Sequence, residues 1–275
     1  MLKARIISAA VLIPLSLLVI FLGGWLYWLL IVVLSLLACA EFVELTKLKA
    51  YTLSLPGVFA LCITWQAGVL WEQGSWFVPT FSLVVAAITF RELILRHNNP
   101  QRIDPTAQWA TTLAVGLYIG IGSSFLIRLR ELENGMWWTL TALPIIWVSE
   151  SGAFFVGKRF GKHKMSPTIS PGKSWEGYAA QVTSGMLTGA LAGWLLPVIY
   201  GSVPHLNPWT GGGLGLLLSA LSTSGDFFVS MIKREVGVKD TGSLIPGHGG
   251  ALDRIDSLLW AGGLAWAYIR LISFI

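Results

Sequence analysis

Residues 109–127 read WATTLAVGLYIGIGSSFLI, an unbroken run of apolar and small residues without one charged side chain. A helix rises about 1.5 Å per residue, so a run of this length approaches the roughly 30 Å needed to cross the hydrocarbon core of a bilayer. Lipid offers no water to backbone N–H and C=O groups, and a helix satisfies them internally. The run therefore predicts a transmembrane helix.

Eight further apolar segments lie on either side of this run. Apolar residues make up 54% of the chain and charged residues 12%, with a mean hydropathy of +0.68. Soluble domains carry about 25% charged residues. We therefore predict an all-α, polytopic integral membrane protein with about nine transmembrane helices. The predicted spans are Ile6–Leu22, Trp25–Ala40, Leu55–Trp71, Trp76–Phe90, Trp109–Ile127, Met136–Val156, Tyr178–Tyr200, Leu214–Ile232 and Leu258–Ile275.

The distribution of basic residues predicts the orientation of these spans. With nine spans, 16 of the 19 Lys and Arg residues fall on the side of the N-terminus. Because positively charged loops stay in the cytoplasm, we expect a cytoplasmic N-terminus and a multi-pass protein of the cell inner (cytoplasmic) membrane. The net charge of +5 is then explained by topology and an anion-binding surface, and nucleic acid is not an expected partner.

Polar loops are concentrated in the second half of the chain. Residues 1–135 have short loops and are predicted to form a lipid-facing scaffold of transmembrane helices. Residues 136–275 contain both long polar loops and are predicted to form the catalytic half, with its active site facing the cytoplasm.

The first polar loop, residues 157–177, reads GKRFGKHKMSPTISPGKSWEG. Pro167 and Pro171 exclude a continuous helix, and a tight Pro-Gly turn is expected to open the next helix. Lys173 would then lie near a helix N-terminus, where backbone amides and the helix dipole favour anions. A P-loop is excluded, because its first glycine would fall on Pro167. The other basic residues of the loop are expected to be solvated charges.

The second polar region, residues 230–256, reads SMIKREVGVKDTGSLIPGHGGALDRID and separates two apolar spans. Asp253 and Asp256 are three residues apart, so they share one face of a helix. Together with Asp226, they offer oxygen ligands from two helices, which suits Mg²⁺. The sequence leaves open whether a second cation binds.

Groups complementary to phosphate surround these acids. Lys233, Arg234, Lys239 and Arg254 supply positive charge, and Gly249 and Gly250 allow backbone amides to face a phosphate. His248 is expected to donate a hydrogen bond to a phosphate oxygen or an aspartate rather than to bind metal. Glu150, inside the sixth span, could contact a cation or headgroup, or form a structural hydrogen bond to a neighbouring helix.

These motifs resemble those of the phosphatidate cytidylyltransferases, also called CDP-diacylglycerol synthases. Lys233-Arg234, Lys239-Asp240, Pro246–Gly250 and Asp253–Asp256 are similar to the family signature, and Ser170–Gly177 to a second conserved element. The chain departs from the family pattern at Glu150, where Asp is usual, and more mildly at Ser174 and Ala251.

The resemblance implies transfer of a cytidylyl group from CTP to phosphatidic acid in the bilayer, giving CDP-diacylglycerol and pyrophosphate. It implies a divalent metal on Asp226, Asp253 and Asp256, and contact between Lys173 and substrate phosphates. The predicted catalytic residues are Lys173, Asp226, Asp253 and Asp256. The predicted substrate-binding residues are Ser170, Glu176, Lys233, Arg234, Lys239, Asp240, His248, Gly249, Gly250 and Arg254.

Two other functions are compatible with the same residues. One is a CTP-dependent kinase, or a cytidylyltransferase, that acts on a different membrane lipid. The other is a cation transporter, for which intramembrane acids are also expected. The sequence does not determine acyl-chain preference or the choice between CTP and dCTP, and it is compatible with both a monomer and a homodimer.

Overall fold

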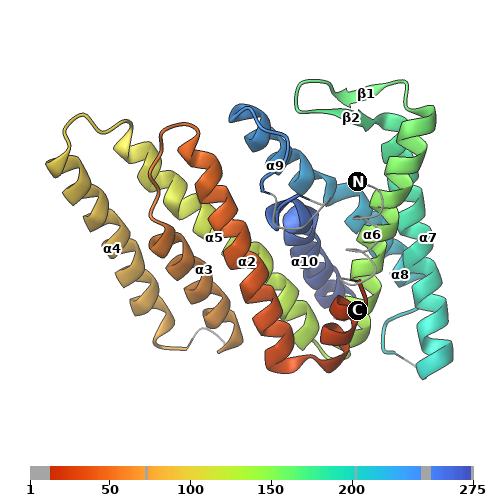
Figure 1. The fold of residues 1–275 in the computed structure, drawn as a ribbon. Coiled ribbons are helices and arrows are strands. Elements are labelled where there is room, and N and C mark those ends of the chain that lie inside the picture. Colours follow the sequence, from red (N-terminus) through yellow and green to blue (C-terminus); the bar gives the residue numbers. More distant parts are fainter. Residues whose placement is uncertain (1–12, 72–73, 202, 243–248, 274–275) are drawn as a thin grey trace.

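The computed structural model describes residues 13–71, 74–201, 203–242 and 249–273. After a short helix over Ile13–Leu22, the chain is a bundle of helices with one small hairpin of strands (Figure 1). The elements are α2 (Gly24–Lys47), α3 (Leu55–Leu70), α4 (Phe77–Asn98), α5 (Pro105–Glu131), α6 (Gly135–Phe160), β1 (Lys164–Ser166), β2 (Ser170–Ser174), α7 (Trp175–Tyr200), α8 (Pro208–Leu221), α9 (Thr223–Glu235) and α10 (Leu252–Ile272).

Six helical stretches in the described part of the chain are long and apolar enough to cross a membrane. They are α2, α4, α5, α6, α7 and the combined stretch Pro208–Glu235, which contains α8 and α9. The helices Ile13–Leu22 and α3 are apolar but shorter. These helices confirm an all-α membrane protein, whereas the count of nine spans and the orientation of the N-terminus stay predictions.

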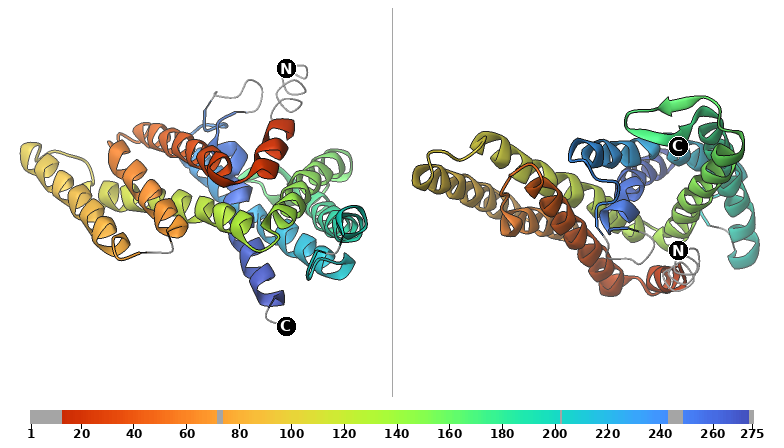
Figure 2. Two further views of the ribbon diagram at one scale, coloured as in Figure 1. Left: turned by 90° about the horizontal axis from the view of Figure 1, so that it is seen from below. Right: turned by 45° about the horizontal axis from the view of Figure 1, so that its top comes forward.

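Many large apolar side chains lie on the outer surface of the bundle. Leu83 on α4 is 70% exposed, Phe155 on α6 is 69% exposed and Val198 on α7 is 69% exposed. The helices α4 and α7 stand at opposite edges of the bundle (Figures 1 and 2). Outward-facing apolar side chains of this kind are stable when lipid is their solvent.

Helix α10 lies at the centre and connects the two halves of the chain. It contacts α2 and α5 from the first half and α6, α8 and α9 from the second (Figure 1). One buried apolar cluster joins α10 to α2, α3, α5 and α9, and a second joins it to α5, α6 and α8. The predicted boundary near Gly135 stays a prediction, but residues on either side of it share these cores.

The loop after α6 forms an antiparallel hairpin instead of an irregular loop. Strand β1 pairs with β2, with Lys164 opposite Ser174 and Ser166 opposite Ser170. The prediction that prolines exclude a helix here is confirmed. The expected tight Pro-Gly turn is wrong, because Pro171 and Gly172 lie within β2, an edge strand where proline costs no ladder hydrogen bond.

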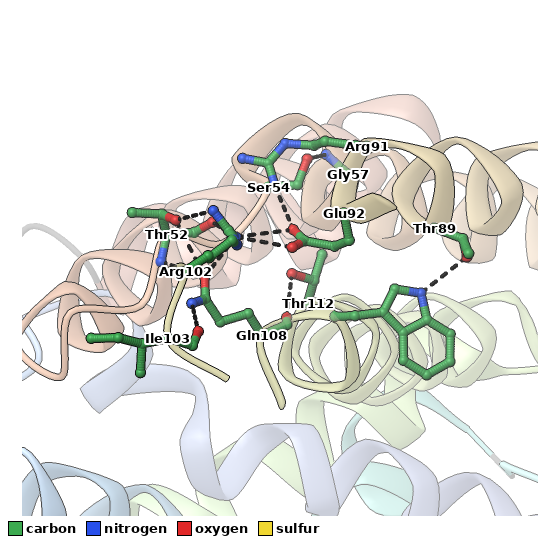
Figure 3. Close-up of polar contacts among 11 residues, drawn as sticks. Thr52, Ser54, Gly57, Thr89, Arg91, Glu92, Arg102, Ile103, Gln108 and Thr112 are labelled. Atoms are coloured by element: carbon green, nitrogen blue, oxygen red, sulfur yellow. Dashed lines mark hydrogen bonds and ion pairs between the residues drawn. The ribbon is translucent and has the colours of Figure 1, made fainter. Parts of the chain in front are cut away.

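A buried polar cluster connects α4 to α5 and to the segment that leads into α3 (Figure 3). The Arg102 guanidinium lies 3.0 Å from the Glu92 carboxylate, and donates hydrogen bonds to the Thr52 hydroxyl at 2.8 Å and the Gln108 side-chain carbonyl at 2.7 Å. The side chains of Glu92 and Arg102 are 7% and 10% exposed. Helix α4 buries little of its apolar surface, so this cluster is one of the main contacts that hold its C-terminal half to the rest of the protein.

We expect Arg102→Ala to destabilise the fold without changing the chemistry of the site described below. Glu92 keeps Arg91 as a charged partner at 2.6 Å, but the Thr52 hydroxyl and the buried Gln108 side chain lose the donor that Arg102 supplies. Leaving buried polar groups without a partner typically costs about 1–3 kcal/mol. Thermal unfolding of the purified protein in detergent measures the loss, and Arg96→Ala, at an exposed position of α4, is the matched control. An unchanged unfolding midpoint for Arg102→Ala would contradict the role of the cluster.

Candidate active site

A cavity of about 550 Å³ opens between α6, the hairpin, α7 and α9. Its floor and walls carry charged and polar groups from segments far apart in the sequence. The polar and charged lining residues are Glu150, Lys158, Lys164, Ser170, Lys173, Ser174, Tyr178, Gln181, Thr223, Asp226 and Ser257. Of the sequence-predicted site residues, Lys173, Asp226 and Ser170 line it directly.

Lys173 enters this cavity from the end of β2, two residues before α7 begins. The Ser174 side chain caps α7 by accepting a hydrogen bond from the Gly177 amide at 3.2 Å, so the predicted position of Lys173 near a helix N-terminus is confirmed. The Lys173 ammonium lies 2.8 Å from the Asp226 carboxylate and 4.0 Å from the centre of the Phe227 ring. Lys173 and Asp226 therefore form an ion pair at the cavity.

Asp226 lies in the first turn of α9, where the helix passes close to α10. A Cβ atom on Gly225 would lie 2.2 Å from the backbone oxygen of Asp256, so only glycine permits this approach. The Ser230 hydroxyl donates a hydrogen bond to Asp226 at 3.0 Å. Asp256 is buried, and lies within electrostatic reach of Asp226 and of Glu150 on α6.

Glu150 faces the cavity and lies beside the Ser257 side chain of α10. Asp226, Arg254 and Lys173 are close enough to influence its charge. Glu150 could therefore form a structural hydrogen bond to the neighbouring helix α10 or contact a cation or headgroup in the cavity, as the sequence left open.

Asp253 lies in the first turn of α10 and has its own set of partners. Its carboxylate accepts hydrogen bonds from the Lys233 ammonium at 2.6 Å, from the Thr241 amide at 2.8 Å and from the Gly250 amide at 3.1 Å. Its side chain is 6% exposed and that of Lys233 is 10% exposed. Both of its oxygens are therefore engaged by the chain itself.

The predicted Mg²⁺ site depends on how closely the carboxylates of the site lie to one another. Among the described residues, no three Asp, Glu, His or Cys side chains lie close enough to hold a metal ion by themselves. Mg²⁺ does not need such a cage, because it keeps several waters and binds through one or two carboxylates together with substrate phosphates. Asp226 lines the cavity, where it is paired with Lys173, and Asp256 is buried behind it in α10. The assignment of Asp226, Asp253 and Asp256 as metal ligands stays a prediction.

Two predicted substrate-binding residues support loops. The Arg234 guanidinium donates to the Ile169 carbonyl at 3.2 Å, which attaches α9 to the hairpin. The Glu176 carboxylate accepts a hydrogen bond from the Lys162 amide at 3.2 Å and lies 2.6 Å from the His163 ring nitrogen, which fixes the start of the loop.

Four of the remaining predicted residues are described by the structure and are not part of the cavity lining. Lys239, Asp240 and Arg254 are exposed, and Gly249 has a φ of 83°, a conformation that favours glycine. His248 lies outside the described residues.

Several lining residues were not predicted as site residues from the sequence. The Gln181 side chain donates a hydrogen bond to the Thr223 hydroxyl at 2.9 Å, which connects α7 to the start of α9. A glutamine within an otherwise apolar span is a usable signal for such a contact. Lys164 and Tyr178 gave no comparable signal, because a basic loop residue and a tyrosine at a span end are both explained by membrane topology.

Comparison with known proteins assigns the chain to a family. The model of the cytidylyltransferase family matches residues 3–272. A phosphatidate cytidylyltransferase of Mycobacterium bovis is 30% identical over 89% of this chain and 81% of its own length. Those of Synechocystis sp. and Staphylococcus aureus are 31% and 30% identical, over 98% and 94% of this chain and 96% and 95% of their own lengths. The chain therefore belongs to the cytidylyltransferase family.

Proposed function

We propose that this protein transfers a cytidylyl group from CTP to phosphatidic acid, giving CDP-diacylglycerol and pyrophosphate for phospholipid synthesis. The observation that carries the proposal is the pair of Lys173 and Asp226, 2.8 Å apart, in a cavity that several charged side chains line, in a family member with membrane-spanning helices. The similar full-length proteins named above carry the name of this activity.

The reaction forms a bond between a phosphatidate oxygen and the α-phosphorus of CTP and breaks the bond to pyrophosphate. The phosphate of the lipid is already anionic, so the site does not need a strong general base. The chain must instead hold two anions together and stabilise the charge that develops on the leaving pyrophosphate. Lys173 and the basic lining residues Lys158 and Lys164 can provide that charge.

Mg²⁺ is the proposed cofactor, with Asp226 and Asp256 as its protein ligands. When bound, it would neutralise phosphate oxygens and help to align the reacting groups. Lys173 would then orient the nucleotide from the hairpin side of the cavity. Asp253 can join this set only by giving up hydrogen bonds from Lys233, Thr241 or Gly250.

The site is proposed to face the cytoplasm from the inner membrane, with the N-terminus on the same side and about nine spans in total. The basic residues of the cavity belong to the chain segments whose charge predicts a cytoplasmic location. CTP arrives from the cytoplasm, and phosphatidic acid from the surrounding bilayer.

The purified protein, given phosphatidate, Mg²⁺ and CTP labelled at the α-phosphate, is expected to produce labelled CDP-diacylglycerol together with pyrophosphate. Chelation of Mg²⁺ with EDTA should lower the rate by at least about 100-fold, since a metal ion supplies several kcal/mol of charge stabilisation. Added Mg²⁺ should restore the rate. Release of CDP instead of pyrophosphate would indicate a CTP-dependent lipid kinase.

The same assay in sealed vesicles tests the orientation. CTP does not cross membranes, so inside-out vesicles should be active without detergent, whereas right-side-out vesicles should require permeabilisation. The opposite pattern would place the site on the other side. Cation flux into proteoliposomes without lipid turnover would favour a transporter.

A further inference from the structure

Glu41, in the last part of α2, contacts the segment that leads into α10. Its carboxylate accepts hydrogen bonds from the Ala251 amide at 2.7 Å, the Leu252 amide at 2.9 Å and the Thr241 hydroxyl at 2.9 Å. These partners are about 200 residues away in the sequence. No role was predicted for Glu41 from the sequence.

The start of α10 needs such a partner. Its N-cap residue, Ala251, has no side chain that could accept a hydrogen bond from the first turn. The carboxylate of Glu41, from another helix, instead accepts hydrogen bonds from the amides of Ala251 and of Leu252, the first residue of α10. A negative charge at this end is favoured by the helix dipole. A Cβ atom on Gly250 would lie 2.1 Å from a Glu41 oxygen, so the backbone closely surrounds the carboxylate.

The Thr241 hydroxyl connects Glu41 to Asp253, one of the predicted site residues. The Thr241 hydroxyl lies 2.9 Å from Glu41 and 3.0 Å from Asp253, so the two carboxylates are held on either side of it. Asp256 lies one turn further along α10. The position of the first turn of α10 therefore decides where both aspartates lie.

We propose that Glu41 is a positioning residue of the enzyme, which caps α10 from α2 and thereby sets the position of Asp256 relative to Asp226. Glu41 does not itself touch substrate. The inference rests on the proposed function for its effect on catalysis, but its structural part, the cap on α10, can be tested independently of activity.

The test compares Glu41→Gln, Glu41→Asp and the parent protein, with Glu44→Gln as the matched control. Glu44 lies on the same helix, and its carboxylate forms an exposed ion pair with Lys47. Two quantities are measured for each folded protein: steady-state kinetics of CDP-diacylglycerol formation, and hydrogen–deuterium exchange of peptides that cover residues 249–256.

Glu41→Gln places an amide N–H₂ group against backbone donors and removes the charge. It is expected to lower kcat by about 10- to 100-fold, the scale of a small misplacement of catalytic groups, with KM for CTP changing by less than about threefold. Exchange at the start of α10 should rise. Glu41→Asp keeps the charge and should retain more of kcat than Glu41→Gln, while Glu44→Gln should match the parent in both measurements.

A kcat for Glu41→Gln within about twofold of the parent would overturn the proposal, as would unchanged exchange over residues 249–256. If Glu41→Gln does not yield folded protein, Glu41→Asp decides, because its shorter side chain should still raise exchange there and lower kcat. An Asp variant identical to the parent overturns the proposal. If the parent makes no CDP-diacylglycerol, the proposed function fails, whereas the exchange measurement still tests the cap.

Discussion

Asp226→Asn is expected to lower kcat for CDP-diacylglycerol formation by about 1000-fold or more. The substitution keeps the size of the side chain and its hydrogen bond from Ser230 but removes the negative charge. A metal ion contributes several kcal/mol to charge stabilisation, and about 4 kcal/mol corresponds to 1000-fold in rate. Initial rates at a series of Mg²⁺ concentrations measure the loss, which high Mg²⁺ should recover only in part.

The control for Asp226→Asn is Glu235→Gln, at the end of the same helix. Glu235 is exposed and pairs with Lys49 on the surface, so its loss should leave kcat unchanged. If Asp226→Asn keeps more than a tenth of the parent kcat, with unchanged Mg²⁺ dependence, Asp226 is not a ligand of the catalytic metal.

Lys173→Met is expected to lower kcat by about 100- to 1000-fold, the usual effect of removing one well-placed group that stabilises charge in the transition state. The methionine keeps most of the apolar part of the side chain but loses the ammonium group that lies 4.0 Å from the centre of the Phe227 ring. Lys173→Arg should recover part of the activity, because it keeps the charge but changes the position and number of donors. Steady-state kinetics with CTP as the varied substrate measures both variants.

Lys162→Met serves as the control for this lysine. Lys162 belongs to the same polar loop, but its side chain is exposed and is not part of the cavity lining. Equal losses for Lys162→Met and Lys173→Met would mean that the loop contributes only general positive charge. A strong loss for Lys173→Met alone supports a specific contact with phosphate.

Local sequence signals predicted the parts of the site that depend on neighbours along the chain. The Pro171-Gly172 pair was expected to form a turn that opens a helix beside Lys173. The turn is wrong, because the pair lies in β2, but Lys173 does lie two residues before α7. Asp253 and Asp256 were expected on one helix, and both lie at the start of α10. The placement of the two aspartates succeeds because helical periodicity acts over three or four residues.

Contacts between distant segments were not predictable in the same way. The spacing of Asp253 and Asp256 predicted that they share a helix, but it did not predict their partners. Lys233 forms an ion pair with Asp253, and Asp226 lies near Asp256. Glu41 gave no signal, because a single acid near the end of an apolar span is also explained by a solvated helix end. Such pairings depend on how the helices pack, which no single stretch of sequence contains.

The ion pair between Lys173 and Asp226 would couple the binding of a metal ion to the binding of the nucleotide. If Asp226 holds the metal ion and Lys173 the nucleotide phosphates, as proposed, a cation arriving alone would have to displace the ammonium group from its carboxylate. A triphosphate arriving alone would have to draw the lysine away from that carboxylate. When both arrive, the two charges exchange partners, so each ligand raises the affinity for the other by the same factor. This thermodynamic linkage would favour the magnesium chelate of the nucleotide over either component by itself.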